Sequence, residues 1–390
     1  MPLFRRRRSA ASESAAGIDA FWSHWPELRG TLAESVDAGS PLPEEAAERL
    51  TGLVRRIHPA LGWEVSAAPP AGGNPLEDLQ SSLDADPGEL MARLAELDDP
   101  SALLGGDGPS YALTLRSGPD DEARIAAERW SRAAPEEPDW AFRPSLPADH
   151  EALSRPLDWN GHELDLAHTS VELRADPRRG TLTAGVYHPD FMFLPEEDQA
   201  GVAEHVVLLA LGEDDYVRAI GAVRALVEKP LDPLPPTSIP SVAHQLGHGS
   251  GGALVSAEAR HPVLGPLEVL LRHPVQRRDF PVFTLLLQVV LPYGEADAEK
   301  QPKGSSAAAL EAMDARLEEV LGADGALFLQ QTGGGRREML FYLDPESQVL
   351  PSVEDAVSSW SEGRPGMKTQ LDPDWSVFNR ITGKFRGLRS

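Results

Sequence analysis

Apolar and polar positions in the last third of the chain alternate in patterns that predict strands and helices in turn. Leu267, Val269 and Leu271 alternate with polar residues, as on a half-buried strand, whereas Val282–Leu291 is almost continuously apolar, which is typical of a central strand. The other elements predicted here are helices over 307–321 and 352–362 and strands over 326–330, 337–343 and 368–371. This order predicts an α+β fold, in which antiparallel sheets carry helices packed on one face.

The first two-thirds of the chain predict helices mixed with shorter strands. Apolar residues at helical spacing, from Ile18 through Trp22 and Trp25 to Leu28, predict an amphipathic helix. The region beyond it predicts helices over 43–58, 75–97, 120–133 and 195–211, and strands over 62–67, 111–115, 140–142, 170–174 and 181–187. Residues 217–227 fit a helix and a strand equally well.

Two stretches rich in Pro and Gly divide the chain. Residues 144–156 resemble a loop, and residues 230–255 contain too few regularly spaced apolar side chains to predict a packed element. The predicted parts are a disordered basic tail (1–17), an acidic α+β region (18–229) with a break near 144–156 that would divide it into two, a linker (230–255), an α+β domain (256–380) and a basic tail (381–390).

The chain is strongly acidic, with 36 basic against 61 acidic side chains and a net charge of −25. Most of this excess lies before residue 256. Such a field repels phosphate, so we expect neither nucleic acid nor an anionic membrane as the main partner. The chain has no cysteine, which excludes disulfides, thiolate nucleophiles and Cys-zinc sites and fits a reducing compartment.

Neither a signal peptide nor a membrane span is predicted. Arg5–Arg8 are followed by small and polar residues, where a secretory signal needs an apolar run of at least ~7 residues. The longest apolar run, near Leu285–Leu291, is far shorter than the roughly 18 residues of a membrane helix. We therefore expect a cytoplasmic protein.

Two short motifs in the last third resemble a known family. The run Gly335–Tyr342, which contains Arg337, Glu338 and Phe341, resembles the "G-x-R-E-x-x-F-Y" strand of the domain-of-unknown-function family numbered 695. Leu371–Phe378 resembles the closing "D-P-x-W-x-x-Y" motif of that family, with Phe in place of the usual Tyr. The resemblance covers roughly residues 260–380. Phe21-Trp22 and residues 134–144 are similar to the N-terminal part of the longer bacterial members.

The resemblance implies a fold and a type of activity. In outline the domain is similar to the B-type protein regulator of ribonuclease E activity, a ferredoxin-like inhibitor that acts by binding. It therefore implies a ferredoxin-like C-terminal domain and a protein-binding role. It brings no catalytic residues.

The most suggestive chemical motif is a pair of histidines, His244 and His248. On a helix, this spacing can hold zinc beside an intervening Glu that acts as general base. Here Gln245 stands at the position of the Glu and cannot accept a proton. Pro240 and the glycine-rich residues 249–252 also disfavour a stable helix, so a solvated linker is the better interpretation.

Other candidate sites lack the spacing that their chemistry requires. Ser250 lies among glycines, but a nucleophile elbow needs Gly where His248 stands. The acidic clusters 196–198 and 213–215 do not have the spacing of a calcium loop and are better explained as solvated helix ends. We therefore predict no metal, no cofactor and no catalytic residue.

The sequence favours binding over catalysis. Our hypothesis is a non-catalytic binding or regulatory protein that contacts another protein. Its speculative partner surface comprises Arg336, Arg337, Asp372 and Asp374. Trp375, beside those acids, is expected to be core, on a short helix capped by Asp372 or Asp374. Two alternatives remain: a hydrolase-type enzyme with a dispersed active site, and an acidic inhibitor of a basic toxin.

Overall fold

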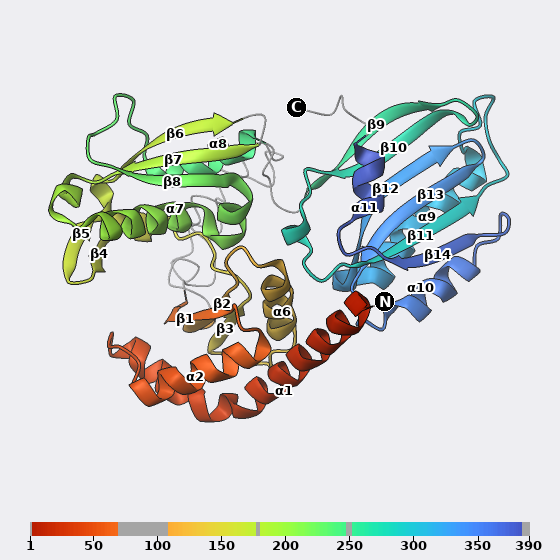
Figure 1. Cartoon of the computed structure of the whole chain (residues 1–390). Helices are drawn as coiled ribbons and strands as arrows, with labels where there is room; N and C mark the ends of the chain where they lie inside the picture. The colour runs from red at the N-terminus through yellow and green to blue at the C-terminus, as the bar shows by residue number, and fades with distance from the viewer. Residues whose placement is uncertain (1, 69–107, 177–179, 247–251, 384–390) are drawn as a thin grey trace, which may run out of the picture. The chain divides into compact units, whose positions relative to one another are not determined.

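The computed structural model describes residues 2–68, 108–176, 180–246 and 252–383, with side chains from residue 13 on (Figure 1). The chain divides into two compact units. Unit 1 comprises Met1–Ala148 and Gly212–Val217, and unit 2 comprises Asp149–Leu211 and Arg218–Ser390. Both contain helices and sheets, so the α+β fold class is confirmed. The predicted helix over 75–97 lies outside the described residues.

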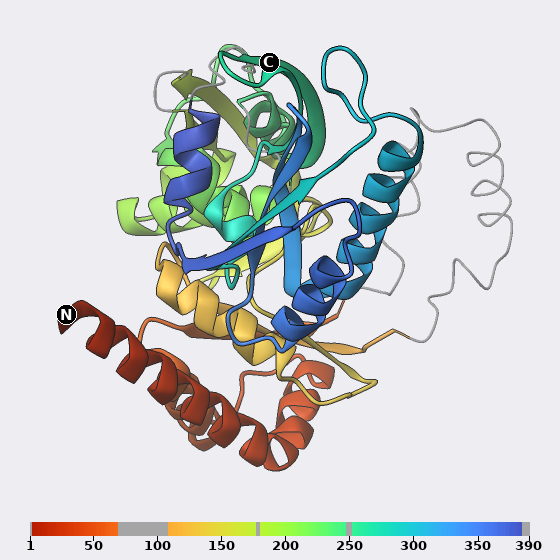
Figure 2. The ribbon, with the colours of Figure 1, turned by 90° about the vertical axis from the view of Figure 1, so that its right-hand side faces the viewer.

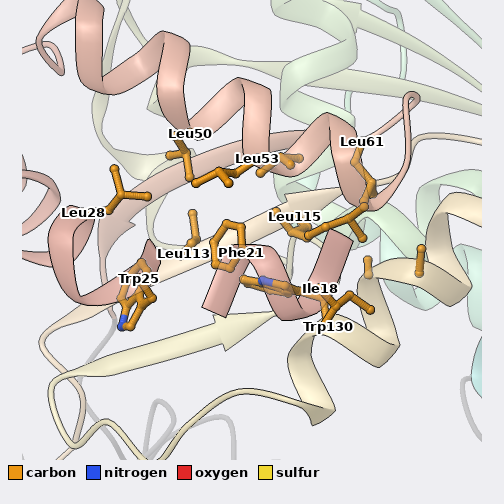
Figure 3. Packing of buried hydrophobic residues seen from close by; sticks show 14 of the residues in the cluster. Ile18, Phe21, Trp25, Leu28, Leu50, Leu53, Leu61, Leu113, Leu115 and Trp130 are labelled. Carbon is orange, nitrogen blue, oxygen red and sulfur yellow. The ribbon is translucent and has the colours of Figure 1, made fainter. Parts of the chain in front are cut away.

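Unit 1 packs helices against a small sheet. Its elements are α1 (Pro2–Asp37), α2 (Glu44–Ile57), β1 (Gly62–Ala67), β2 (Tyr111–Arg116), α6 (Asp121–Arg132) and β3 (Trp140–Arg143). The sheet order is β1-β2-β3, with β1 antiparallel and β3 parallel to β2. Figure 3 shows the core, in which Phe21 and Trp25 of α1 and Trp130 of α6 are buried among leucines of α2 and β2. The predicted amphipathic helix is therefore confirmed.

The N-terminal segment differs from its prediction. Residues 1–17 were expected to be a disordered tail, but α1 begins at Pro2 and is continuous with the predicted helix. The residues of this segment explain the difference, because Arg and Ala have high helix propensity and the packed half of α1 provides a nucleus for extension.

The first part of unit 2 contains a hairpin and a three-stranded sheet. Its elements are η1 (Ala152–Ser154), β4 (Pro156–Trp159), β5 (His162–Asp165), η2 (Leu166–His168), β6 (Ser170–Asp176), β7 (Thr181–Tyr187), η3 (Pro189–Phe193), α7 (Glu196–Ala219), β8 (Ile220–Leu226), η4 (Pro236–Ser238) and α8 (Ile239–Gln245). The sheet order is β6-β7-β8, with β6 antiparallel and β8 parallel to β7. Residues 217–227, which fit either structure, thus divide between the end of α7 and β8.

Helix α7 is interrupted at Gly212, whose φ of 71° lies in the left-handed region. A Cβ there would lie 2.8 Å from the backbone nitrogen of Ala148, so both the conformation and the space require glycine. The next residue, Glu213, is buried. Its carboxylate accepts hydrogen bonds from the backbone amides of Gly118 (2.6 Å) and Leu146 (3.3 Å). The segment Gly212–Val217 of α7 thereby belongs to unit 1, whereas the residues of α7 before and after it belong to unit 2.

The rest of unit 2 is a six-stranded sheet with two longer helices on one face and the short last helix on the other. Its elements are β9 (Ala253–His261), β10 (Gly265–His273), η5 (Arg277–Asp279), β11 (Leu285–Pro292), α9 (Gly304–Leu321), η6 (Gly322–Asp324), β12 (Gly325–Gly333), β13 (Arg336–Leu343), α10 (Val349–Ser358), β14 (Gly366–Leu371) and α11 (Ser376–Thr382). The order is β14-β11-β13-β12-β10-β9, and every pair is antiparallel. Figure 2 shows α9 and α10 side by side, and their apolar faces share one core with β11 and β13. The predicted element order is present, with β9 in addition.

The segment predicted as a linker, 230–255, contains packed elements in its described residues, 230–246 and 252–255. Leu234 forms a bridge with Val171 of β6, and Ile239 of α8 is fully buried. The pattern gave no indication of this, because α8 buries only Ile239 and Ala243. His244 lies on the exposed side of α8, and His248 and Ser250 lie outside the described residues.

Within the described part of the chain, no helix combines the length and the apolar character that crossing a bilayer requires.

Candidate binding surface

Arg337, predicted for a partner surface, instead points into unit 2. It is buried on the helix-covered face of the sheet, where its guanidinium donates to Thr332 Oγ1 (2.9 Å) and forms an ion pair with Asp314 of α9. Burial raises the pKa of Asp314 to about 6, because the attraction of Arg337 offsets only part of the cost of desolvation. Arg337 therefore joins α9 to the sheet.

Asp372 is also an internal residue. Its carboxylate accepts hydrogen bonds from the Tyr342 hydroxyl (2.7 Å) and from the amides of Ser376 (2.8 Å) and Val377 (2.9 Å), so it caps α11 as expected. Burial alone would raise its pKa, but these donors outweigh burial and hold the pKa below its ordinary value. Burial and the hydrogen bond to Asp372 raise the pKa of the Tyr342 hydroxyl.

Trp375 is a core residue, as predicted, with 2% of its surface exposed. Its indole N–H donates to the Phe283 carbonyl (2.8 Å), and its ring meets Phe328 edge-on at 4.6 Å. The Arg277 guanidinium lies over the Trp375 ring, 5.3 Å from its centroid. Both short motifs of the family resemblance thus pack this part of the sheet.

The remaining two predicted residues are exposed but far apart along the sheet. Arg336 begins β13, whereas Asp374 follows β14. β13 ends at Leu343, which pairs through Leu285 of β11 with Leu371 at the end of β14. Arg336 and Asp374 are therefore at opposite ends of the strands, and the structure does not bring the four residues onto one surface.

A different surface gathers large apolar side chains at one end of the β6-β7-β8 sheet. Tyr187, at the end of β7, pairs with Leu226, at the end of the parallel strand β8, so the segments that follow both strands leave the same end. The first carries Met192 and Phe193, which are 72% and 71% exposed, and the second carries Val227 and Leu231, which are 70% and 103% exposed. We call these four residues the strand-end surface.

The path of the second segment crosses the same end of the sheet. It leaves β8 and reaches Leu234, which bridges Val171 on the outer side of β6 (N···O 2.8 and 2.9 Å). It therefore spans three strand spacings of about 4.8 Å, or about 14 Å, and passes the end of β7, from which η3 emerges. In Figure 1 both segments are at the left-hand end of this sheet.

Buried contacts hold η3 in place beneath its exposed side chains. His188 is buried, and its Nε2 lies 2.8 Å from the Asp165 carbonyl while its Nδ1 accepts from the Asp190 amide (3.2 Å). The Gln199 side-chain amide donates to the carbonyls of Phe191 (2.9 Å) and Leu194 (2.8 Å), which are themselves buried. Met192 and Phe193 are thus presented outward by a segment with fixed backbone.

The second segment is stiffened by proline. Pro230, Pro233 and Pro235 fix their own φ angles and restrict the residues before them to extended conformations. Pro236 is buried and Ile239 of α8 follows it into the core, so the segment is anchored beyond Leu231 as well.

The sequence contains a partial signal for this surface. Phe191–Leu194 is a run of four large apolar residues between two prolines, too short for an amphipathic helix. The pattern does not reveal which two are buried, since that depends on the bonds of His188 and Gln199.

The described residues contain no cluster of three or more His, Asp or Glu side chains arranged for a metal ion. No protein-family model matches the chain, and comparison with curated proteins and with solved structures gives no match either.

Proposed function

We propose that the chain is a non-catalytic binding or regulatory protein that contacts another protein through the strand-end surface. The observation that carries the proposal is the exposure of Met192, Phe193, Val227 and Leu231 on two segments fixed from below. Isolated exposed apolar residues are common, but a group of four at one sheet end marks an interaction site.

The fixed backbone favours binding for an energetic reason. A partner that covers Phe193 and Leu231 gains the free energy of removing apolar surface from water, at about 25 cal/mol per Å². A mobile loop would lose part of this gain in becoming ordered, whereas η3 is already held by His188 and Gln199. Large apolar anchors of this kind contribute most of the affinity at protein interfaces.

The proposal includes the remaining sequence hypotheses. A cytoplasmic location fits the absence of cysteine, because disulfides do not persist in a reducing compartment and a protein there does not use them for stability. The resemblance to family 695, and the binding role that the similarity to the B-type regulator implies, are part of this proposal and agree with a protein that acts through contacts.

The test compares capture of a partner by matched variants of the full chain. Phe193→Ser and Leu231→Ser remove anchors of the strand-end surface, and Val263→Ser removes an equally exposed apolar residue (82%) from the β9–β10 turn. After cross-linking in native lysate, the same protein should be recovered with the parent and with Val263→Ser, and lost with the other two. Equal recovery with all four chains would contradict the proposal.

Salt dependence separates the two contributions to this contact. If acidity steers the partner, association slows as the screening length falls from ~10 Å at 0.1 M to ~3 Å at 1 M salt. An apolar contact alone would be unaffected between those limits.

A further inference from the structure

The two segments that form the strand-end surface carry more carboxylates than cations. Residues 188–198 and 226–236 carry six acidic side chains but only one basic one, Lys229. Five of these acids form no ion pair with any residue that the structure describes: Glu196, Glu197, Asp198, Glu228 and Asp232, of which Asp198 accepts hydrogen bonds from neutral donors of Trp159 and Asn160. Asp190 faces only the His188 ring, at 3.7 Å. The surface therefore combines exposed apolar side chains with excess negative charge.

Several acidic side chains elsewhere in the molecule are neutralised by internal ion pairs. In unit 1, Arg124 pairs with Glu128 (2.9 Å) and with Asp214 (3.1 Å), and Arg29 pairs with Glu137 (2.9 Å). In unit 2, Asp314 pairs with Arg337. On the strand-end surface, unpaired acids lie on the same two segments as four exposed apolar side chains.

The first turn of α7 determines the sign of charge that this end of the sheet accepts. A helix N-terminus ordinarily favours an anion, because its free amides and dipole are positive. Here Glu196 and Glu197 occupy that turn and are exposed, so the favourable position is taken by the chain's own carboxylates. An anionic ligand would meet repulsion, and a cationic one attraction.

We infer that the strand-end surface binds a segment of a partner protein in which arginine or lysine residues flank large apolar side chains. This inference rests on the proposed function and names the chemistry of the partner. The apolar side chains cover Phe193 and Leu231, and the cations lie against Glu196, Glu197 and Glu228. Arginine suits this place better than lysine, because its planar guanidinium also stacks on the ring of Phe193.

The probe is a labelled synthetic peptide of alternating arginine and leucine, titrated against the full chain by fluorescence anisotropy. We expect saturable binding that weakens with salt. A glutamate–leucine peptide of the same length should not bind, because its charge is repelled. An arginine–serine peptide should bind much more weakly, because it cannot cover the apolar side chains.

Variants of the full chain localise the contact. Phe193→Ser should abolish binding of the arginine–leucine peptide. Glu196→Gln, Glu197→Gln and Glu228→Gln should each weaken it by about two- to fivefold, the range of a single exposed ion pair. Glu354→Gln, an exposed acid on α10, should leave it unchanged. Equal binding by all of these variants would overturn the inference.

The outcomes distinguish this inference from the proposed function. If Phe193→Ser loses the cross-linked partner but the parent does not bind the arginine–leucine peptide, the function stands and the stated chemistry is wrong. If the peptide binds and capture is unaffected by Phe193→Ser, the surface has this chemistry and the proposed function fails.

The competing candidate for the occupant of the strand-end surface is the basic segment 384–389 of this chain. Lys384, Arg386 and Arg389 there alternate with Phe385 and Leu388. Neutralising the three cations in the full chain should leave affinity for the peptide unchanged if the occupant is another protein. A marked gain in affinity would show that this end occupies the surface, and would overturn the assignment to a partner.

Discussion

Two segments of unit 2 have similar compositions, but one is buried in the core and the other exposes part of its apolar and acidic side chains. Residues 372–378 and residues 189–198 each combine acidic side chains, proline and two aromatic residues. In the first, Trp375 and Phe378 are buried, and Asp372 is fully used in capping α11. In the second, Phe193 is exposed, and Glu196 and Glu197 are unpaired.

The difference shows what composition leaves undetermined. Asp372 precedes a helix whose amides it can reach, and a sheet face with Phe328 and Tyr342 is available to the aromatics. Segment 189–198 buries Phe191 and Leu194, and its short 3₁₀ turn directs the intervening pair to solvent. Structural and binding roles therefore depend on the neighbouring elements.

The largest expected effect is at Trp375. Trp375→Ala removes a buried indole, its bond to the Phe283 carbonyl and its contact with Phe328. The free energy of unfolding should fall by about 3–5 kcal/mol, a large share of the 5–15 kcal/mol typical of a domain. Thermal and urea unfolding measure this fall in the free energy of unfolding. Parent-like melting would show that the packing of this segment contributes little.

Asp372 gives the next largest effect and a dependence on pH. Asp372→Asn removes the carboxylate that binds Tyr342 and two amides, and should cost about 1–3 kcal/mol at pH 7. The pKa of Asp372 is lower in the folded state than in the unfolded chain, so its stabilisation is present above the ordinary pKa of about 4 and is lost as the pH falls through the folded value.

Parent and Asp372→Asn should therefore converge in stability below about pH 4, measured by urea unfolding across the pH range. A difference that stays constant down to pH 2 would show that the charge of Asp372 does not contribute.

A substitution at Gln199 tests the rigidity of residues 189–198. Gln199→Met leaves the carbonyls of Phe191 and Leu194 without this donor, and should cost about 1 kcal/mol. Hydrogen exchange at the Leu194 amide, which bonds to Phe191, should become faster. Gln245→Met, at the exposed end of α8, is the control and should not alter that rate.

The smallest effect on stability is expected at Phe193. Phe193→Ser alters an exposed side chain and should change the free energy of unfolding by less than about 0.5 kcal/mol. Urea unfolding of Phe193→Ser and of Trp375→Ala, measured under the same conditions, compares the stability contributions of the two segments. A loss of several kcal/mol would mean that Phe193 is part of the packed structure.

Periodicity predicts the elements that bury a full stripe and misses those that bury little. The helix containing Phe21 and Trp25 and the strand Leu285–Pro292 follow directly from apolar spacing. β9 is a largely exposed edge strand with no buried residue, and α8 buries only two residues, so neither leaves a clear pattern. Low apolar content in such a segment therefore does not indicate a linker.

The candidate surface was less predictable than the fold. The sequence predicted a partner surface from the charges of Arg337 and Asp372. In the structure both side chains are instead bonded inside the molecule to residues distant in sequence, Arg337 to Asp314 and Asp372 to Tyr342. The strand-end surface depends on the register of β7 with β8 and on the path to Leu234. These are long-range pairings that local patterns do not contain.

The interruption of α7 at Gly212 has a consequence for how the chain folds as it is synthesised. Glu213 supplies the carboxylate that binds the amides of Gly118 and Leu146, yet it follows them by the whole of Asp149–Leu211. The ribosome must therefore release most of α7 before unit 1 can be completed. A nascent chain that ends at Ala148 contains β1, β2, β3, α1, α2 and α6 of unit 1 but not the buried carboxylate of Glu213. Unit 1 should gain full resistance to protease only when synthesis has passed Val217.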